Sequence, residues 1–260
     1  MKKFVALLLA VLMVASLCAC GQKGTGSDLQ TVTKGKLIMS TNAEFAPYEY
    51  VADDGKGFQG TGYEGIDIEI AYALAQKLGL ELVVDNMDFD AALSAVQTGK
   101  SDMVAAGVTV TPDRLNAMSF TDSYANGVQV VIVKEGSDIK SIDDLQGKKI
   151  GTQRGTTGFT YCSDDFGDDN VIGFDDGATA VQNLKAGKID CVVIDNVPAQ
   201  EYVKANPGLT ILDTEYANED YAIGIAKDNT ALQEALNKAL AELKADGTIQ
   251  SIIDKYISAK

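Results

Sequence analysis

The 260-residue sequence contains no histidine. A Ser-His-Asp or Cys-His nucleophile is therefore impossible, and the commonest protein ligand of zinc is missing. This single absence excludes a large share of hydrolase mechanisms. We expect neither a metal site nor a cofactor site.

Basic residues are also scarce, with 22 Lys and Arg against 37 Asp and Glu and a net charge of −15. Lys2 and Lys3 belong to a segment that we expect to be removed, and residues 21–260 then keep 37 acidic and 20 basic side chains. No basic cluster interrupts this balance. The acidity argues against nucleic acid as a partner and against adhesion of the folded part to an anionic membrane.

The chain has four cysteines, two of which end an N-terminal targeting segment. Lys2 and Lys3 precede an apolar run over residues 4–17 that is too short for a permanent membrane span. The run continues into Ala19 and Cys20, which resemble the end of a bacterial lipobox; at Cys18 a bulky leucine would occupy the cleavage position.

We therefore predict that residues 1–20 are a lipoprotein signal peptide and that Cys20 becomes a diacylated, palmitate-type N-terminus. An ordinary secretory signal is the alternative. Residues 21–35 would form a flexible tether. The other two cysteines, Cys162 and Cys191, are expected on a helix and a strand as two buried thiols, with a disulfide as the alternative.

The first folded stretch pairs a strand with an aromatic loop. Residues 36–40 predict a strand that runs into a loop with Asn42 and Phe45. An aromatic loop directly after a strand often forms a pocket wall. For Tyr48 and Tyr50 we favour packing on the core, but not for Phe45.

Helix and strand patterns then alternate. An amphipathic helix is predicted over residues 65–78 and ends at Gly79. A strand follows over residues 80–84, and a second helix begins at Phe89.

Arg114 stands out at the start of the next helix. Thr111 suits the N-cap and Pro112 the first helical position, so Arg114 lies in the first turn, where the helix dipole favours an anion. An anion from elsewhere would explain it, because Gly107 permits close approach to the backbone and Thr109 offers a hydroxyl and an amide. The alternative is a surface arginine paired with Asp113 or Asp122.

Three segments in register identify a resemblance. Residues 41–50 (TNAEFAPYEY), 65–70 (GIDIEI) and 106–114 (AGVTVTPDR) are similar to the signatures of polar amino-acid-binding proteins, the extracytoplasmic receptors of ABC importers in solute-binding protein family 3. The likeness extends from about residue 36 to the end of the chain.

The resemblance implies a binding site for a free L-amino acid and no catalysis. Arg114 would bind the α-carboxylate, helped by the amides of Thr109 and Thr157, whereas Asp195 would bind the α-ammonium together with the Gly107 carbonyl and the Thr109 hydroxyl. The remaining site residues that it implies, including the aromatic pair that would sandwich the side chain, are Asn42, Phe45, Phe89, Ala106 and Thr156.

The second half of the chain repeats the pattern. Residues 149–153 form a predicted strand that ends in a Gly/Thr loop, which presents free amides to an anion. Asp195 follows the strand predicted at residues 191–194, at the carboxyl end where ligands bind open α/β sheets; its alternative role is to cap the next helix. A helix, a Gly-Lys turn and a strand occur twice, ending at residues 102–105 and 191–194.

We thus predict an α/β fold of the type II periplasmic-binding-protein kind, with two lobes of mainly parallel sheet and two hinge strands. The predicted boundaries are residues 36–123 and 222–260 for the first lobe, 128–217 for the second, and about 124–127 and 218–221 for the hinges. The expected partners are the permease and ATPase subunits of an ABC importer, and we expect a monomer that is attached to the bacterial cell membrane only by its lipid.

The identity of the ligand is the least determined point. Many relatives that prefer cations carry Asp where this chain has Asn42, so the sequence favours a neutral polar amino acid, whereas its overall acidity weakly favours a cation. Two other functions stay open. A cyclohexadienyl dehydratase on the same fold would need a general acid such as Glu44 or Glu64, and a sensory module would signal instead of transporting.

Overall fold

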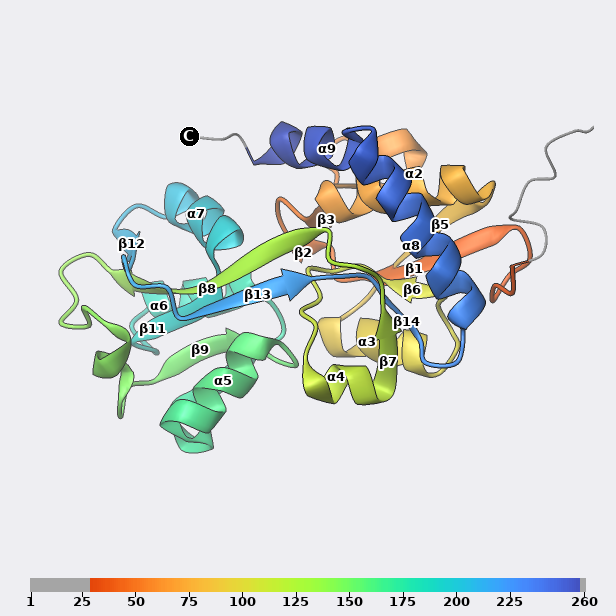
Figure 1. Cartoon of the computed structure of the whole chain (residues 1–260). Helices are drawn as coiled ribbons and strands as arrows, with labels where there is room; N and C mark the ends of the chain where they lie inside the picture. Colours follow the sequence, from red (N-terminus) through yellow and green to blue (C-terminus); the bar gives the residue numbers. More distant parts are fainter. Residues whose placement is uncertain (1–28, 258–260) are drawn as a thin grey trace, which may run out of the picture.

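The computed structural model describes residues 29–257. Two α/β lobes lie side by side, and two long strands run between them (Figure 1). This confirms the predicted fold class. The predicted signal peptide and Cys20 lie outside the described residues, and within residues 29–257 no helix has the length and apolarity to cross a membrane.

The sheet of the first lobe has the strand order β5-β1-β6-β14-β7. Its strands are β1 (Lys36–Thr41), β5 (Glu81–Asn86), β6 (Met103–Val104), β7 (Met118–Phe120) and β14 (Gly224–Ala226). β5, β1 and β6 run parallel, whereas β14 is antiparallel to both of its neighbours. The carboxyl ends of the parallel strands therefore meet at one edge, from which the loops with Asn42 and Gly107 leave.

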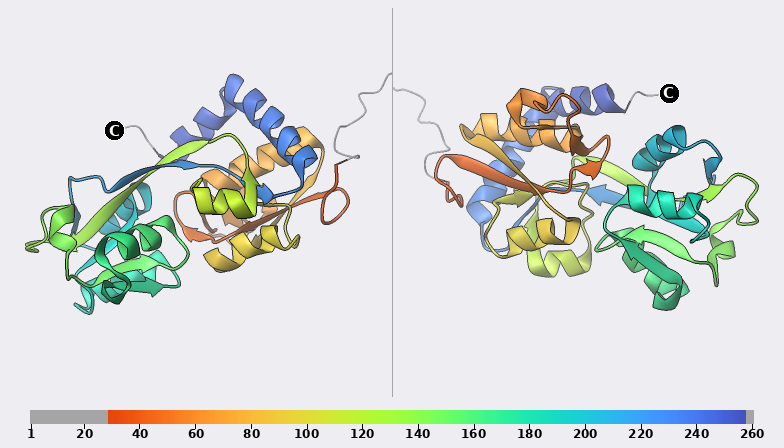
Figure 2. Two further views of the ribbon diagram at one scale, coloured as in Figure 1. Left: turned by 60° about the horizontal axis from the view of Figure 1, so that its bottom comes forward. Right: turned by 180° about the vertical axis from the view of Figure 1, so that it is seen from behind.

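Helices cover both faces of this sheet, as the two turned views also show (Figure 2). They are α2 (Ile66–Leu78), α3 (Phe89–Gln97), α4 (Pro112–Ala117), α8 (Thr230–Ala245) and α9 (Thr248–Tyr256). α2 ends as predicted at Gly79, whose φ of 69° is left-handed. The loop after β1 contains a small antiparallel sheet, with the elements β2 (Glu44–Phe45), β3 (Glu49–Val51), η2 (Phe58–Gly60) and β4 (Tyr63–Glu64). The Gly-rich residues 53–62 indicated the hairpin of β3 and β4, but the sequence did not predict β2.

The second lobe has a sheet of order β10-β9-β11-β8-β12, with β13 also paired to β8. Its strands are β8 (Ala125–Lys134), β9 (Ile150–Gln153), β10 (Val171–Phe174), β11 (Cys191–Asp195), β12 (Leu209–Ile211) and β13 (Ala217–Tyr221). Its helices are η3 (Ile142–Leu145), α5 (Thr157–Phe166), η4 (Asp168–Asn170), α6 (Gly177–Lys185) and α7 (Asn196–Ala205). The pairs α3–β6 and α6–β11 are the repeated helix–strand unit that the sequence indicated.

β8 and β13 form the antiparallel connection between the lobes, with Gly127 opposite Glu219 and Ala125 opposite Tyr221. Tyr221 also forms an isolated bridge with Thr109 of the first lobe. The connecting strands therefore touch residues of the predicted site directly.

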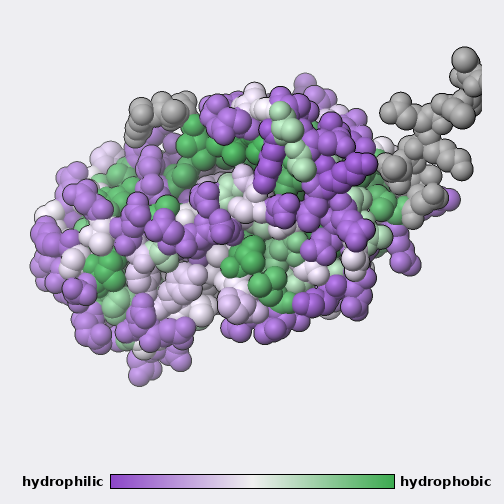
Figure 3. Space-filling view, viewed as in Figure 1, coloured by the Kyte–Doolittle hydropathy of each residue, from purple (hydrophilic) through white to green (hydrophobic). Residues whose placement is uncertain are grey.

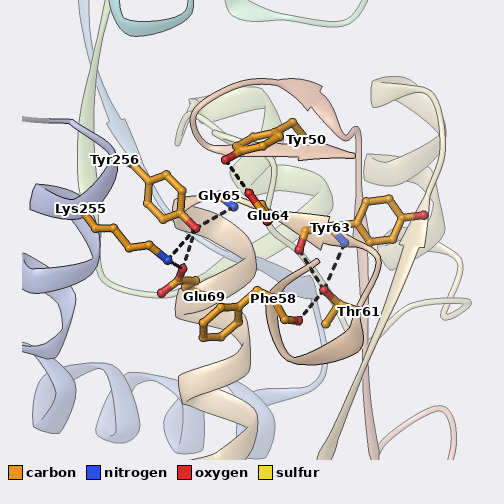
Figure 4. Close-up of polar contacts among 9 residues, drawn as sticks. All are labelled: Tyr50, Phe58, Thr61, Tyr63, Glu64, Gly65, Glu69, Lys255 and Tyr256. Atoms are coloured by element: carbon orange, nitrogen blue, oxygen red, sulfur yellow. Dashed lines mark hydrogen bonds and ion pairs between the residues drawn. The ribbon is translucent and has the colours of Figure 1, made fainter. Parts of the chain in front are cut away.

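The C-terminal helix α9 is attached to the start of α2 by a small polar cluster (Figure 4). The Tyr256 hydroxyl donates to Glu69 Oε1 at 2.6 Å and accepts from the Gly65 amide at 3.3 Å. Lys255 completes the cluster with an ion pair to the same Glu69 carboxylate, of which only 8% of the side chain is exposed. This cluster joins the C-terminal helix α9 to α2 in the first lobe.

Cys162 on α5 and Cys191 on β11 are buried, free thiols. The predicted pair of buried thiols is thus what the structure contains. The face of the molecule in Figure 3 is largely hydrophilic, with separate hydrophobic patches, as the charge content of the sequence leads one to expect.

Candidate functional site

One pocket of about 480 Å³ lies between the lobes, where the carboxyl ends of both sets of parallel strands meet the connecting strands. Its size is that of a small-molecule site. Its lining includes all ten ligand-binding residues predicted from the sequence: Asn42, Phe45, Phe89, Ala106, Gly107, Thr109, Arg114, Thr156, Thr157 and Asp195.

Arg114 is held by backbone carbonyls from both lobes. Its Nη1 donates to the Thr109 carbonyl at 2.9 Å and its Nη2 to the Gly155 carbonyl at 3.0 Å. Its guanidinium lies 5.5 Å from the centroid of the Phe89 ring. Within residues 29–257 Arg114 forms no ion pair with Asp113 or Asp122, so that alternative is wrong. The side chain is oriented as a half-buried cation that faces the pocket.

The local helix start explains how Arg114 reaches this position. Thr111 caps α4 as predicted, since its hydroxyl accepts from the Arg114 amide at 3.2 Å, and Pro112 occupies the first helical position. Burial lowers the pKa of Arg114, and the nearby Glu219 carboxylate on β13 opposes this shift. An arginine remains protonated at neutral pH even so, and it can accept an anionic partner.

Two backbone amides border the same part of the pocket. The Thr157 amide is at the first position of α5, behind the cap residue Thr156, whose hydroxyl accepts from the Phe159 amide at 3.3 Å. No carbonyl or side chain in the described part of the chain accepts a hydrogen bond from the Thr109 or Thr157 amide. With Arg114 they provide several donors for one carboxylate.

Asp195 forms the acidic end of the pocket and is almost fully buried, with 1% of the residue exposed. Its Oδ1 accepts from the Val197 amide at 2.9 Å, and its Oδ2 accepts from the Val128 amide at 2.9 Å and the Tyr221 hydroxyl at 3.1 Å. Asp195 therefore caps α7, as the alternative interpretation predicted, and it also lines the pocket. Burial raises its pKa to about 6, although the three donors act in the opposite direction. A cationic partner would stabilise the carboxylate.

Gly107 brings the backbone of the first lobe against the pocket. Its φ is 54°, and a Cβ at this position would lie 2.9 Å from Cε1 of Phe45. Both facts require glycine. The Gly107 amide donates to Asp67 Oδ2 at 2.9 Å, which fixes this peptide beside the Phe45 ring.

The end of the pocket lined by Asn42 is polar and joins the lobes. Asn42 donates to the Met87 carbonyl at 3.0 Å and accepts from Gln153 Nε2 at 2.9 Å. Gln153 also donates to the Asp175 carbonyl at 3.0 Å. A second contact between the lobes runs from the Tyr202 hydroxyl to the Glu44 carbonyl at 3.3 Å. Together with the Arg114–Gly155 bond, these contacts close the cleft over the pocket.

Sequence reasoning missed six lining residues: Glu49, Gln129, Gln153, Val193, Ile194 and Tyr221. Gln153 ends a predicted strand at the ligand edge of its sheet, and Tyr221 lies in a segment predicted to connect the lobes. The position of each of these two residues along the chain could therefore have identified it as a pocket residue. Glu49 had no such signal, because nothing in the sequence indicates which way its side chain points from the aromatic loop.

The family model for bacterial extracellular solute-binding proteins, family 3, matches residues 37–259. The chain belongs to this family. The match spans both lobes and every residue of the pocket, and it covers the three motifs from which the resemblance was inferred. Within residues 29–257 no group of three or more Cys, Asp or Glu side chains could hold a metal ion.

Two relatives illustrate what this family 3 solute-binding protein is similar to. The arginine-binding extracellular protein ArtP of Bacillus subtilis (strain 168) is 33% identical, over 100% of both chains. An ancestral arginine-binding protein bound to arginine is 40% identical with a TM-score of 0.79, over 86% of this chain and 99% of that one. A structure of an ancestral arginine-binding protein bound to glutamine is also 40% identical with a TM-score of 0.80, over 87% of this chain and 100% of that one.

The family and these relatives show the general role of the chain: it is an amino-acid-binding protein of the kind that serves ABC importers. The family description and the name of ArtP both describe extracellular proteins.

Proposed function

We propose that the protein is a lipid-anchored receptor that binds a free basic amino acid, arginine first, and delivers it to the permease and ATPase of an ABC importer. The ten predicted site residues keep the roles given to them above. Arg114 and the two threonine amides bind the α-carboxylate, and Asp195 binds the α-ammonium. Phe45 and Phe89 enclose the side chain.

The observation that supports a basic ligand is an acidic rim beside the polar end of the pocket, which consists of Glu44, Asp88 and Asp176. Asp88 directly follows the carbonyl that Asn42 binds, and Asp176 directly follows the carbonyl that Gln153 binds. Partial burial and then the charges of Asp176 and Asp88 raise the pKa of Glu44, so Glu44 lies close enough to both aspartates to be repelled by them.

A cationic side chain that reached this rim would relieve the repulsion between acids from both lobes. The sequence favoured a neutral ligand because Asn42 itself is uncharged, but the charge lies around this residue and not on it. The arginine specificity that is named for ArtP and for the ancestral protein points the same way. The glutamine complex of an ancestral arginine-binding protein keeps a neutral ligand as the second candidate.

Titration calorimetry with arginine and citrulline tests the proposal, because citrulline has nearly the same shape without the charge. We expect arginine to bind at least about tenfold more tightly, a difference of about 1.4 kcal/mol. The double variant Glu44→Gln/Asp176→Asn should narrow this ratio. Glu81→Gln, an exposed carboxylate on β5, is the matched control and should leave it unchanged. Equal affinities for arginine, citrulline and glutamine would refute the basic specificity.

Closure of the cleft follows from the same contacts. Each lobe carries only part of the site, so a bound amino acid favours the closed form by its higher affinity for that form. The permease would then recognise the closed receptor. The lipid at Cys20 would keep the receptor at the membrane surface where the permease lies.

A further inference from the structure

Two buried carboxylic acids lie at the wall of the pocket, and one of them, Glu49, lines it. Glu49 on β3 and Asp67 in the first turn of α2 each have only 1% of their surface exposed. The two carboxyl groups lie close enough to one another for the charge of Asp67 to act on Glu49. A hydrogen bond between two carboxyl groups requires a proton on one of them.

Among the described residues, the contacts of the two acids leave one buried oxygen of each without a donor. Asp67 Oδ2 accepts from the Gly107 amide at 2.9 Å and from the Tyr124 hydroxyl at 2.7 Å. Asp67 Oδ1 and Glu49 Oε2 are buried, and within residues 29–257 neither accepts from any N–H or hydroxyl group. One proton between these two oxygens would satisfy both, whereas two ionised carboxylates would repel each other.

The surroundings offer no positive charge that could replace the proton. The other titratable groups that face the pair are the hydroxyls of Tyr48 and Tyr124. In the described part of the chain no lysine or arginine forms an ion pair with Glu49 or Asp67. Burial, and then the charge of Asp67, raises the pKa of Glu49 well above its usual range.

We propose that Glu49 and Asp67 share one proton at neutral pH and that this pair positions Gly107 at the ammonium end of the pocket. Glu49 carries the proton and donates it to Asp67 Oδ1. Asp67 then keeps Oδ2 for the Gly107 amide, which holds this peptide at its left-handed φ with its carbonyl available to a ligand. Only the positioning part of the inference rests on the amino-acid site proposed above.

Infrared spectra of the wild type and of Glu49→Gln, recorded without any ligand and subtracted from one another, test the shared proton. We expect the C=O band of a protonated carboxylic acid to be present at pH 7.5 and to disappear in Glu49→Gln. The control Glu81→Gln should retain it. A wild-type spectrum that has no such band at pH 7.5, or a band that persists in Glu49→Gln, would overturn the shared proton.

The pH dependence of the stability of the protein is a second test of the shared proton. Glu49 is protonated in the folded protein but ionises near pH 4.3 when the chain is unfolded, so its contribution to stability is lost as the pH rises above that value. The unfolding constant of the wild type, relative to that of Glu49→Gln, should therefore increase by up to about tenfold per pH unit from pH 5 upward. Parallel stability curves for the two proteins would contradict the proposal.

Two substitutions at Asp67 test the positioning role. Asp67→Asn keeps an oxygen that can accept from the Gly107 amide, whereas Asp67→Ala leaves that amide buried without a partner. We expect Asp67→Ala to bind arginine at least about fivefold more weakly than Asp67→Asn, since an unsatisfied buried donor is costly. Equal affinities in two folded variants would refute positioning. Failure of the wild type to bind any amino acid would refute the proposed function and leave the infrared result standing.

Discussion

Acidification below pH 6 should weaken amino-acid binding through Asp195. Burial raises the pKa of this carboxyl from 3.8 to about 6 in the protein. At 1.36 kcal/mol per pKa unit, this shift corresponds to about 3 kcal/mol against the ionised form. A ligand ammonium beside Asp195 offsets that cost, so the pKa falls in the complex and binding releases the proton wherever Asp195 is protonated beforehand.

The sign and size follow from this linkage. The free protein binds the proton and the complex does not, so affinity is full above pH 6 and falls as the pH decreases. We expect the affinity for arginine to be about tenfold lower at pH 5 and about a hundredfold lower at pH 4 than at pH 8. Asp195→Asn should bind at least about thirtyfold more weakly at pH 8, because removal of one member of a buried charge pair costs about 2 kcal/mol or more.

Calorimetry between pH 8 and pH 4, in buffers that differ in ionisation enthalpy, measures both the affinity and the number of protons released. The expected release is near zero at pH 8 and approaches one at pH 5. Asp195→Asn should release no proton on binding, and its affinity should be nearly independent of pH. An affinity that stays constant from pH 8 to pH 5 in the wild type, or an equal slope in Asp195→Asn, would refute the reasoning.

Three further substitutions test the polar cluster at α9, the contact between the lobes and the backbone at Gly107. Lys255→Met leaves the buried Glu69 carboxylate without its cationic partner and should cost about 1–3 kcal/mol, a fall of roughly 2–12 °C in melting temperature that calorimetric scanning would detect, with unchanged arginine affinity. Gln153→Ala removes the bond to Asn42 between the lobes, so small-angle scattering should show a more open molecule and binding should weaken several-fold. Gly107→Ala forces a Cβ against a phenylalanine ring at left-handed φ, and titration should show a loss of about tenfold or more.

The motifs placed residues correctly at the pocket because each combines the end of a strand with a residue type that suits only a few structural positions. Thr111 and Pro112 fixed a helix start, which placed Arg114 in its first turn, and the structure has that cap. Asp195 followed a short apolar strand, and Gly107 had a conformational reason to be glycine. Such features can be predicted from the sequence, because they depend on residues that are neighbours along the chain.

What the sequence could not show depends on contacts between distant segments. Gln153 lines the pocket because closure brings it against Asn42, 111 residues earlier in the chain. Glu49 is buried only because Asp67 and the small sheet of β2, β3 and β4 enclose it. The strands β7, β10 and β12 have three or four residues each, too few for a periodic pattern to identify. The expectation of a neutral ligand used Asn42 alone, whereas the acidic rim that supports the proposed basic ligand combines residues of both lobes.

Thermal denaturation of the protein with each of the twenty amino acids tests the central claim most directly. The account predicts that arginine raises the melting temperature most, by a stabilisation of about 2.7 kcal/mol at one hundred times its dissociation constant. It also predicts that Arg114→Ala abolishes the shift. No shift with any amino acid, or a shift with glutamine and none with arginine, would contradict the claim that this family 3 protein is a receptor for basic amino acids.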